Sequence, residues 1–311
     1  MTILIQFALL VVGFVMLVKG ADWFVDGSSG VADKFGIPQL VIGLTIVAMG
    51  TSAPEAAVSI TAAFKGTADI TVGNVVGSNI LNVLIILGLA SAITSIAVAK
   101  TTIKYEIPFM LVVTFMLMGF GYTEGTINRL EGILLWVAFI GYLSYMFWLV
   151  KSGQADAEEI SIEGSMGKML LFIVGGLVLI VWGSDVTVDA ATELAKIFGM
   201  SERFIGLTVV ALGTSLQELF TSVTAARKGK ADIAIGNIVG SNIFNILFVV
   251  GTSAVIIPIT FASLFIIDCL VAVAAGVILW LFVYRSKKLT RVGGIVMLLC
   301  YAAYFVYLIS M

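Results

Sequence analysis

The chain has 311 residues, of which 60% are hydrophobic and 12% are charged, and its formal net charge is -2. Because a soluble domain carries about 25% charged residues, this composition excludes an ordinary globular protein. The balanced charge also argues against a nucleic-acid partner. Runs of about 20 apolar residues recur along the chain, each long enough to cross a bilayer as a helix, so we expect an all-α polytopic membrane protein embedded in the lipid bilayer.

Ten hydrophobic helices are predicted in chain order, five on each side of a polar linker. Their approximate ranges are 3–27, 37–64, 70–97, 104–122 and 129–150, followed by 167–190, 202–227, 233–257, 261–284 and 292–310. The linker is predicted at residues 151–167, which are rich in small and acidic side chains. The first segment has no basic start and no cleavage pattern, so we expect a retained helix rather than a signal peptide.

Two polar segments of the first half return in the second half at a constant offset of 163 residues. The segment GTSAPE (50–55) corresponds to GTSLQE (213–218), and GNVVGSNILN (73–82) corresponds to GNIVGSNIFN (236–245). Between 39–88 and 202–251, 29 of 50 positions are identical. The sequence therefore predicts an internal duplication. The predicted repeats are residues 1–150 and 168–311, and their duplicated cores are residues 37–97 and 202–257.

An odd number of crossings in each repeat predicts that the second repeat enters the membrane in the opposite orientation. Loop charges provide an independent test, because basic residues favour the cytoplasmic side. With both termini outside, the inner loops hold twelve basic residues: Lys34, Lys100, Lys104, Lys151, Lys168, Arg227, Lys228, Lys230, Arg285, Lys287, Lys288 and Arg291. The outer loops hold four: Lys65, Arg129, Lys196 and Arg203. We therefore predict two inverted five-helix repeats in the cell membrane, with both termini outside and the central linker in the cytoplasm.

Four polar residues of the duplicated cores are predicted to converge near the membrane midplane. Glu55 lies nine residues before the end of the second helix and Asn82 twelve residues after the start of the third. At about 1.5 Å per residue, both are roughly 14 to 18 Å from the same face. Glu218 and Asn245 lie at matching distances from the opposite face. Because buried carboxylates without basic partners are unfavourable in a membrane and repel each other, these residues favour a cation site.

The neighbouring residues provide further oxygen ligands for a cation. The glycine and the proline of GTSAPE can open the helix and release the carbonyls of Ala48 and Thr51. Ser78 and Asn82 are four residues apart and share a helix face, and the second copy repeats this pattern. Oxygen ligands without sulfur or imidazole suit calcium- or sodium-like ions. Broken helices in matching positions of two inverted halves are typical of a transport site.

Other small and polar residues are expected to have structural roles. Gly73 and Gly77 fit close helix packing, and Asp69 and Asp232 fit helix N-caps. Asp268 has no evident counterpart in the first half and receives no role. Four aspartates near the ends of the first and sixth helices are interpreted as interfacial or capping groups: Asp22, Asp26, Asp185 and Asp189. The two cysteines, Cys269 and Cys300, are interpreted as separate thiols in apolar segments.

The paired signatures resemble those of the cation/calcium exchanger superfamily, and most closely those of the prokaryotic sodium/calcium exchangers. The GTS segments are similar to the two alpha-repeat signatures, and the GSN segments match their companions. The resemblance spans the whole ten-helix plan and implies broken helices at the midplane and alternating access to central ion sites. It implies that Glu55 and Glu218 are calcium carboxylates. It further implies the carbonyls of Ala48, Thr51, Ala211 and Thr214 and the side chains of Ser52, Ser215, Ser78, Ser241, Asn82 and Asn245 as ligands.

Two positions depart from the family pattern. Gln217 stands where the family normally has proline, so the second kink is expected to be shallower or to depend on Gly213. Asn245 stands where some members have an acidic residue, which leaves two formal charges in the pocket.

The resemblance favours a calcium/sodium antiporter over three other functions. A calcium/proton antiporter is the main alternative, but the GTS segments provide the neutral oxygen ligands that sodium needs. A passive cation channel is disfavoured by the inverted repeats. An intramembrane enzyme would need a nucleophile and a base, and the chain contains no histidine, so we expect no enzyme. We expect a monomer that carries Ca²⁺ and Na⁺ as cargo and needs no cofactor.

Overall fold

The structure is a computed structural model that describes residues 3–68, 70–152, 165–199, 213 and 215–310. These residues form helices that are joined by short connections and by two small strand pairs. Among them, eight helices are long and apolar enough to cross a membrane, and the bent pair Gln39–Thr51 and Ala53–Phe64 adds a ninth crossing if it is one span. The predicted helical membrane protein is confirmed at this level. The predicted helix at 202–227 lies partly outside the described residues.

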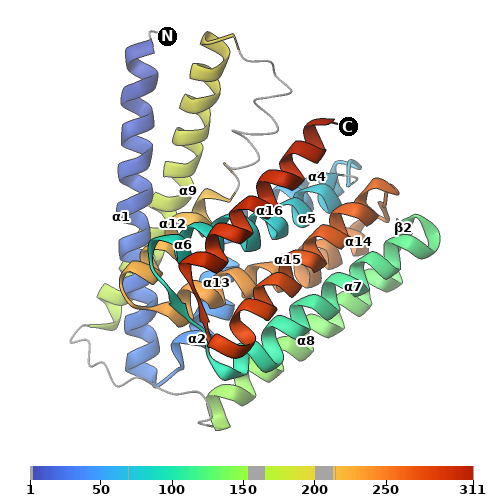
Figure 1. Cartoon of the computed structure of the whole chain (residues 1–311), viewed down its shortest axis with the longest axis horizontal. Helices are drawn as coiled ribbons and strands as arrows, with labels where there is room; N and C mark the ends of the chain where they lie inside the picture. Colours follow the sequence, from blue (N-terminus) through green and yellow to red (C-terminus); the bar gives the residue numbers. More distant parts are fainter. Residues whose placement is uncertain (1–2, 69, 153–164, 200–212, 214, 311) are drawn as a thin grey trace.

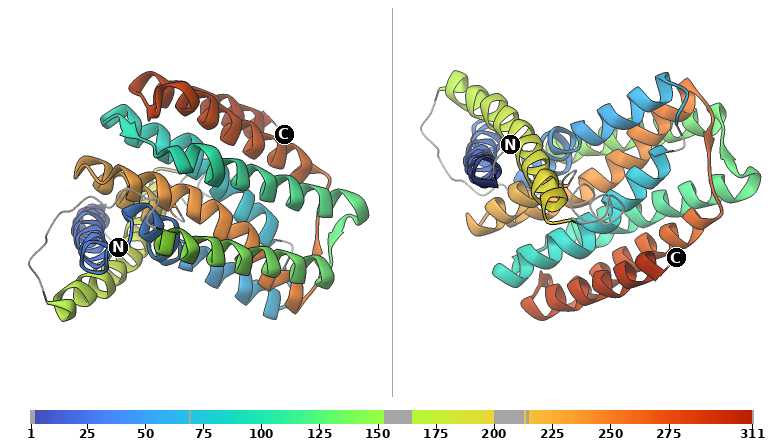
Figure 2. Two further views of the ribbon diagram at one scale, coloured as in Figure 1. Left: turned by 90° about the horizontal axis from the view of Figure 1, so that it is seen from below. Right: turned by 90° about the horizontal axis from the view of Figure 1, so that it is seen from above.

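The two longest helices of the described chain pack against each other. They are α1 (Ile3–Phe35) and α9 (Met166–Ile197), and they run in a different direction from the other long helices (Figure 1, Figure 2). Glycines permit a close approach of their backbones, since a Cβ on Gly20 would lie 2.8 Å from the carbonyl oxygen of Gly176. Any side chain at such a contact would push the two helices apart.

Both long helices extend further than predicted. The sequence predicts ends near residues 27 and 190, where the apolar runs stop, but the helices continue through polar residues to Phe35 and Ile197. Gly36 and Gly199, which follow them closely, have positive φ values of 60° and 77°. Glycine adopts this conformation without strain and commonly ends a helix. The helices therefore end at these glycines and not at the edge of the apolar sequence.

The predicted second helix is bent by 50° at Ser52. It consists of α2 (Gln39–Ile42), the π-helical segment η1 (Gly43–Val47), α3 (Ala48–Thr51) and α4 (Ala53–Phe64). Pro54 lies in the first turn of α4 and lacks the backbone N–H that an unbroken helix would need. In the second half, α12 (Leu216–Arg227) begins at the position that corresponds to the start of α4.

Two interrupted helices form the centre of the molecule. One consists of α5 (Ile70–Leu81), the π-helical η2 (Asn82–Leu87) and α6 (Gly88–Ile93). The other consists of α13 (Ala231–Phe244), the π-helical η5 (Asn245–Val250) and α14 (Gly251–Ile256). In their most apolar windows, 72% of the first helix and 94% of the second are buried inside the protein. These helices therefore carry the duplicated GSN segments into the interior, and π-helical turns are frequent at functional sites.

Four long helices pack around the centre (Figure 1). They are α7 (Ile107–Glu124), which follows the π-helical η3 (Thr102–Glu106), α8 (Arg129–Ser152), α15 (Leu264–Ser286) and α16 (Arg291–Ser310). Short antiparallel strands join the halves: β1 (Ile96–Ala97) pairs with β4 (Lys288–Leu289), and β2 (Thr126–Ile127) pairs with β3 (Ile259–Thr260). The pair β1–β4 therefore corresponds to the pair β3–β2 when the first and second halves are exchanged.

Candidate cation site

Glu55 and Glu218 occupy matching positions at the starts of α4 and α12. Each lies in the first turn of its helix and is buried, with exposed fractions of 2% and 0%. The first turn is the positive end of the helix dipole, which makes a buried negative charge less unfavourable. Ser52, three residues before Glu55, hydrogen-bonds to the carboxylate of Glu218, so the two acidic residues approach each other across the halves. The site therefore brings two negative charges together, one from each half.

Several buried oxygen atoms near these carboxylates have no hydrogen-bond partner among the described residues. They are both carboxylate oxygens of Glu55, Oε2 of Glu218, Oδ1 of Asn82, Oδ1 of Asn245 and the hydroxyl oxygen of Ser215. An unpartnered buried polar group costs about 1–3 kcal/mol, so such a group of atoms needs an explanation. No lysine or arginine of the described chain forms an ion pair with either carboxylate. A hard cation would satisfy these oxygens, and carboxylate, amide and hydroxyl oxygens suit Ca²⁺.

Contacts between the halves bring the oxygen atoms together. The helix α4 packs against η5, which begins at Asn245, and α12 packs against η2, which begins at Asn82. The hydroxyl of Ser52 donates to Oε1 of Glu218 at 2.9 Å and so joins the first signature to the second. The candidate site therefore lies at the interface of the two halves and takes its ligands from both.

Four buried asparagines link the two central helices. Nδ2 of Asn79 donates to the carbonyl of Asn242, and Nδ2 of Asn242 donates to the carbonyl of Asn79, both at 3.1 Å. Nδ2 of Asn82 donates to Oδ1 of Asn242 at 3.0 Å, and Nδ2 of Asn245 donates to Oδ1 of Asn79 at 3.1 Å. The network is reciprocal, and it leaves Oδ1 of Asn82 and Oδ1 of Asn245 as its unpartnered acceptors.

A second pair of asparagines holds α4 and α12 against the centre. Nδ2 of Asn74 donates to the carbonyl of Glu55 at 3.3 Å, and Nδ2 of Asn237 donates to the carbonyl of Glu218 at 3.5 Å. Each amide also donates to a serine hydroxyl one turn further along, at 3.0 and 2.9 Å. These contacts fix the backbone that carries each carboxylate.

The whole chain matches one protein family on both sides of its central linker. The family is the sodium/calcium exchanger protein family, and the matched residues are 5–148 and 168–310. The chain belongs to this family.

Similar proteins cover nearly the full length of this exchanger-family chain. Inner membrane protein YrbG of Escherichia coli (strain K12) is 39% identical over 266 residues, which are 82% of this chain and 81% of that protein. The sodium/calcium exchanger MaX1 of Methanosarcina acetivorans is 32% identical, with 98% of this chain and 99% of that protein covered. A structure of the sodium-calcium exchanger NCX_Mj, soaked with zero Na⁺ and Ca²⁺, superposes with a TM-score of 0.85 at 31% identity, and the match covers 99% of this chain and 100% of that one.

Ten of the twelve predicted ligands are described, whereas Ala211 and Thr214 lie outside the described residues. Ser78 and Ser241 are buried on the central helices, and the hydroxyl of Ser241 donates to the carbonyl of Ala48 at 3.4 Å. That carbonyl also accepts the backbone N–H of Ser52 at 3.0 Å. The bend therefore does not release the carbonyl oxygen of Ala48, which keeps a backbone hydrogen bond.

Thr51 and Gln217 flank the carboxylates in the first and second signatures. The hydroxyl of Thr51 donates to Oδ1 of Asn237 at 2.9 Å, which directs this side chain toward the opposite half. Gln217 lies in the first turn of α12 and is buried. Although Gln217 replaces a proline, α12 begins at the same position as α4, so the start of this helix does not depend on proline.

Sequence reasoning missed the asparagines that support the ligands. Asn79, Asn242, Asn74 and Asn237 are all duplicated residues of the GSN segments, and this repetition was an available signal. Asn79 and Asn242 were not separable from the ligands by spacing alone, because the contacts that distinguish them cross between the halves.

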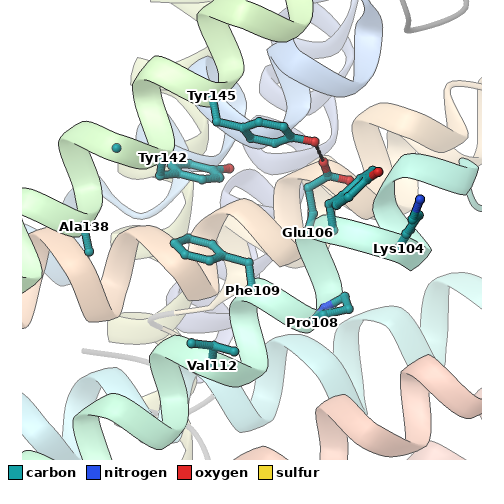
Figure 3. A pocket seen from close by; sticks show the side chains of 10 residues that line it. Lys104, Glu106, Pro108, Phe109, Val112, Ala138, Tyr142 and Tyr145 are labelled. Carbon is teal, nitrogen blue, oxygen red and sulfur yellow. Dashed lines mark hydrogen bonds between the residues drawn. The ribbon is translucent and has the colours of Figure 1, made fainter.

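Glu106 is a further acid that sequence reasoning missed, and it lies away from the candidate site. It is buried at the end of η3 and accepts a hydrogen bond from the hydroxyl of Tyr145 on α8 at 2.6 Å (Figure 3). It borders a largely apolar cavity of about 600 Å³ between α7 and α8, with Phe109 and Tyr142 stacked in its wall. An acidic residue inside an apolar span was the signal that could have identified it.

Asp268 has a counterpart after all. The strands β2 and β4 are related by an offset of 162 residues instead of 163, and at that offset Asp268 corresponds to Glu106. Both residues accept a hydrogen bond from a tyrosine of the next helix, which is Tyr304 for Asp268 at 2.7 Å. The expectation that Asp268 is unique was wrong, because a one-residue length difference between the strands shifts the repeat.

Proposed function

We propose that this chain is a secondary antiporter that exchanges Ca²⁺ for Na⁺ across the membrane by alternating access. The observation that carries the proposal is the group of buried, unpartnered oxygen atoms that includes those of Glu55, Glu218, Asn82 and Asn245. Membership of the sodium/calcium exchanger family supports it, as do the names of the relatives MaX1 and NCX_Mj. Ca²⁺ and Na⁺ are then cargo, and the chain itself supplies the ligands.

The proposed ligands are those inferred from the sequence, with a division of roles between them. Glu55 and Glu218 neutralise the charge of one Ca²⁺, while Asn82 and Asn245 add neutral oxygens. Neutral hydroxyl and carbonyl oxygens complete the sites for Na⁺: those of Ser52, Ser215, Ser78 and Ser241 and of Ala48, Thr51, Ala211 and Thr214. The unpartnered hydroxyl of Ser215 supports this assignment.

The proposed architecture is ten spans in two inverted repeats, 1–150 and 168–311, with a cytoplasmic linker at 151–167 and ion-binding cores at 37–97 and 202–257. Reciprocal strand pairs and reciprocal asparagine bonds support a two-fold relation between the halves. The family match is also interrupted at the linker. Inverted repeats allow one sequence to form both the inward and the outward state, since exchanging the conformations of the halves exchanges the open side.

The proposed topology places both termini outside the cell and the linker in the cytoplasm. A cysteine introduced in the linker, in a background without Cys269 and Cys300, should react with a membrane-impermeant thiol reagent only from the cytoplasmic side. Labelling in intact cells would contradict the topology. We expect a functional monomer, because the candidate site is built within one chain.

Transport into proteoliposomes separates sodium coupling from proton coupling. An outward sodium gradient should drive uptake of radioactive calcium, and a pH gradient in sodium-free medium should not. Uptake driven by the pH gradient alone would support the calcium/proton alternative. A passive channel would instead equilibrate calcium without any imposed gradient.

A further inference from the structure

We propose that Asn79 and Asn242 are positioning residues of the cation site, each of which orients the asparagine ligand of the opposite half. This inference rests on the proposed function. Asn79 holds Asn245 through its Oδ1, and Asn242 holds Asn82 in the same way.

The chemistry of an amide explains why an orienting partner is needed. An asparagine ligand has an oxygen end that binds a cation and an N–H₂ end that repels one. The acceptors Oδ1 of Asn79 and Oδ1 of Asn242 engage the N–H₂ groups, so the oxygens of Asn245 and Asn82 remain available, buried and without another partner. The partner therefore determines which end of each ligand faces the ion.

The residue type at position 79 follows from its two simultaneous contacts. Its oxygen accepts from Asn245, while its nitrogen donates to the carbonyl of Asn242. An aspartate could accept but could not donate, and it would add a third negative charge to the centre. A leucine has the same size but makes neither contact. Only an amide of this length satisfies both, and the same argument applies to Asn242.

The reciprocal geometry makes a prediction that an ordinary structural role does not make. If Asn79 acts through Asn245, the effects of Asn79→Leu and Asn245→Ala on calcium affinity overlap, and the double variant is no worse than Asn245→Ala. The control pair is Asn79 and Asn74, because Asn74 donates to the carbonyl of Glu55 and to the hydroxyl of Ser59 and not to the four-asparagine network, so its effect should add to that of Asn79→Leu.

The experiment is a calcium titration of the purified protein and of the single and double variants, with folding checked by thermal unfolding. Asn79→Leu should weaken calcium binding about 10- to 100-fold, as loss of an outer partner typically does. If Asn79→Leu does not fold, Asn79→Ser takes its place in the same cycle. Unchanged affinity, or effects of positions 79 and 245 that add, would overturn the proposal. Glu55→Gln separates the two failures, since unchanged binding in that variant rejects the site itself.

A second inference rests on different residues and on the same proposed function. We infer that Lys228 and its duplicate Lys65 form alternating ion pairs, one in each access state. Lys228, at the end of α12, contacts Oδ1 of Asp26 at 2.8 Å and Oδ1 of Asp22 at 3.2 Å on α1. The duplicate set consists of Lys65, which directly follows α4, and of Asp185 and Asp189 on α9, at the same offset of 163 residues.

Only one of these two sets is paired in the structure. Lys65, Asp185 and Asp189 are all described, and no ion pair joins the lysine to either aspartate. The packing differs in the same sense: Thr221 on α12 has no exposed surface, whereas its duplicate Val58 on α4 is 49% exposed. The second-repeat lysine is thus paired and the first-repeat lysine is not. Exchanging the two conformations would pair Lys65 with Asp185 and Asp189 and separate Lys228 from α1.

Distances between spin labels test this exchange without any transport assay. Labels on Phe64→Cys and Ile197→Cys, both at exposed positions and in a background without the native cysteines, report the separation of α4 and α9. Lys228→Gln should increase the population with the shorter distance, and Lys65→Gln should decrease it, each by roughly two- to fivefold, as expected for a partly exposed ion pair. No change, or a change in the same direction for both variants, would overturn the inference. Sodium-driven calcium uptake into proteoliposomes, measured in parallel, tests the proposed function independently of the spin-label distances.

Discussion

The centre of the molecule is alike in its two halves, whereas the contacts that α1 and α9 make with α12 and α4 are not. The asparagine bonds between the central helices occur in reciprocal pairs, and both central helices change to π-helix at the same duplicated residue. In contrast, α1 packs along α12 and pairs with Lys228, while α9 makes no comparable contact with α4 among the described residues. This difference supports a division of roles in which the proposed ion binding and the proposed change of access involve different helices.

The largest expected effect comes from removing a charge at the symmetric centre. Glu55→Gln or Glu218→Gln leaves one negative charge for a divalent ion, so either change should reduce calcium exchange by at least about 100-fold, the upper range for lesser changes around a bound metal. Calcium uptake into proteoliposomes measures this. Glu124→Gln, at an exposed helix end, is the matched control and should have no effect. If one of the two glutamate variants kept the same calcium exchange as the Glu124→Gln control, the two halves would not contribute equally to the site.

The next effect concerns the contact between α1 and α9. A Cβ on Gly20 would lie 2.8 Å from the carbonyl of Gly176, so Gly20→Leu should lower stability by about 1–3 kcal/mol through overpacking. Gly141→Ala, at a position with open space, is the control and should be neutral or slightly stabilising. Thermal unfolding in detergent compares the two variants. A tolerated leucine would mean that the two helices are not held at this distance.

A smaller effect is expected from membrane potential, and it depends on the charge of the centre. With two carboxylates and two neutral asparagines, one Ca²⁺ would neutralise the site, while three Na⁺, the number that the resemblance to sodium/calcium exchangers implies, would leave it one charge positive. One charge crossing the membrane is worth about 2.3 kcal/mol per 100 mV, so an inside-negative potential should speed sodium-driven calcium extrusion. Calcium flux at clamped potentials tests this. Exchange that does not respond to potential would reject the three-for-one ratio but would keep the site.

The smallest effect is expected for an ion pair that stays within one helix. Lys196 and Glu193 both lie on α9, are about half exposed and contact each other at 3.2 Å. Because this pair does not join two helices, Lys196→Gln should leave the spin-label distance populations unchanged. It should change the free energy of unfolding by no more than about 0.5 kcal/mol. If Lys196→Gln changed the distance populations as much as Lys228→Gln does, net charge, and not the contact between α1 and α12, would control the populations of the two access states.

The proposed ligands could be selected from the sequence because the chain contains both signature segments twice. Duplication identified Glu55, Glu218, Asn82 and Asn245 together, and the absence of basic residues beside them indicated a cation. The ends of α1 and α9 were not predicted correctly, because helical hydrogen bonding continues through polar residues until a glycine ends it. The apolar pattern marks where lipid contact ends, which is a different boundary.

The supporting contacts could not be predicted, for a related reason. The roles of Asn79 and Asn82 differ only in which atom of the other half each one meets, and sequence spacing contains no such information. The same holds for Lys228 and Lys65, which have equivalent sequence contexts although only Lys228 forms an ion pair among the described residues. Contacts between the halves decide these roles, and they appear only once the helices are packed.

The most direct test of the account is a crystal structure of the protein grown with calcium. We predict one strong calcium peak between the carboxylates of Glu55 and Glu218, with Oδ1 of Asn82 or Asn245 among its ligands, and we predict that excess sodium removes the peak. A calcium ion bound elsewhere, for example beside Glu106, with the carboxylates of Glu55 and Glu218 unoccupied, would contradict the account.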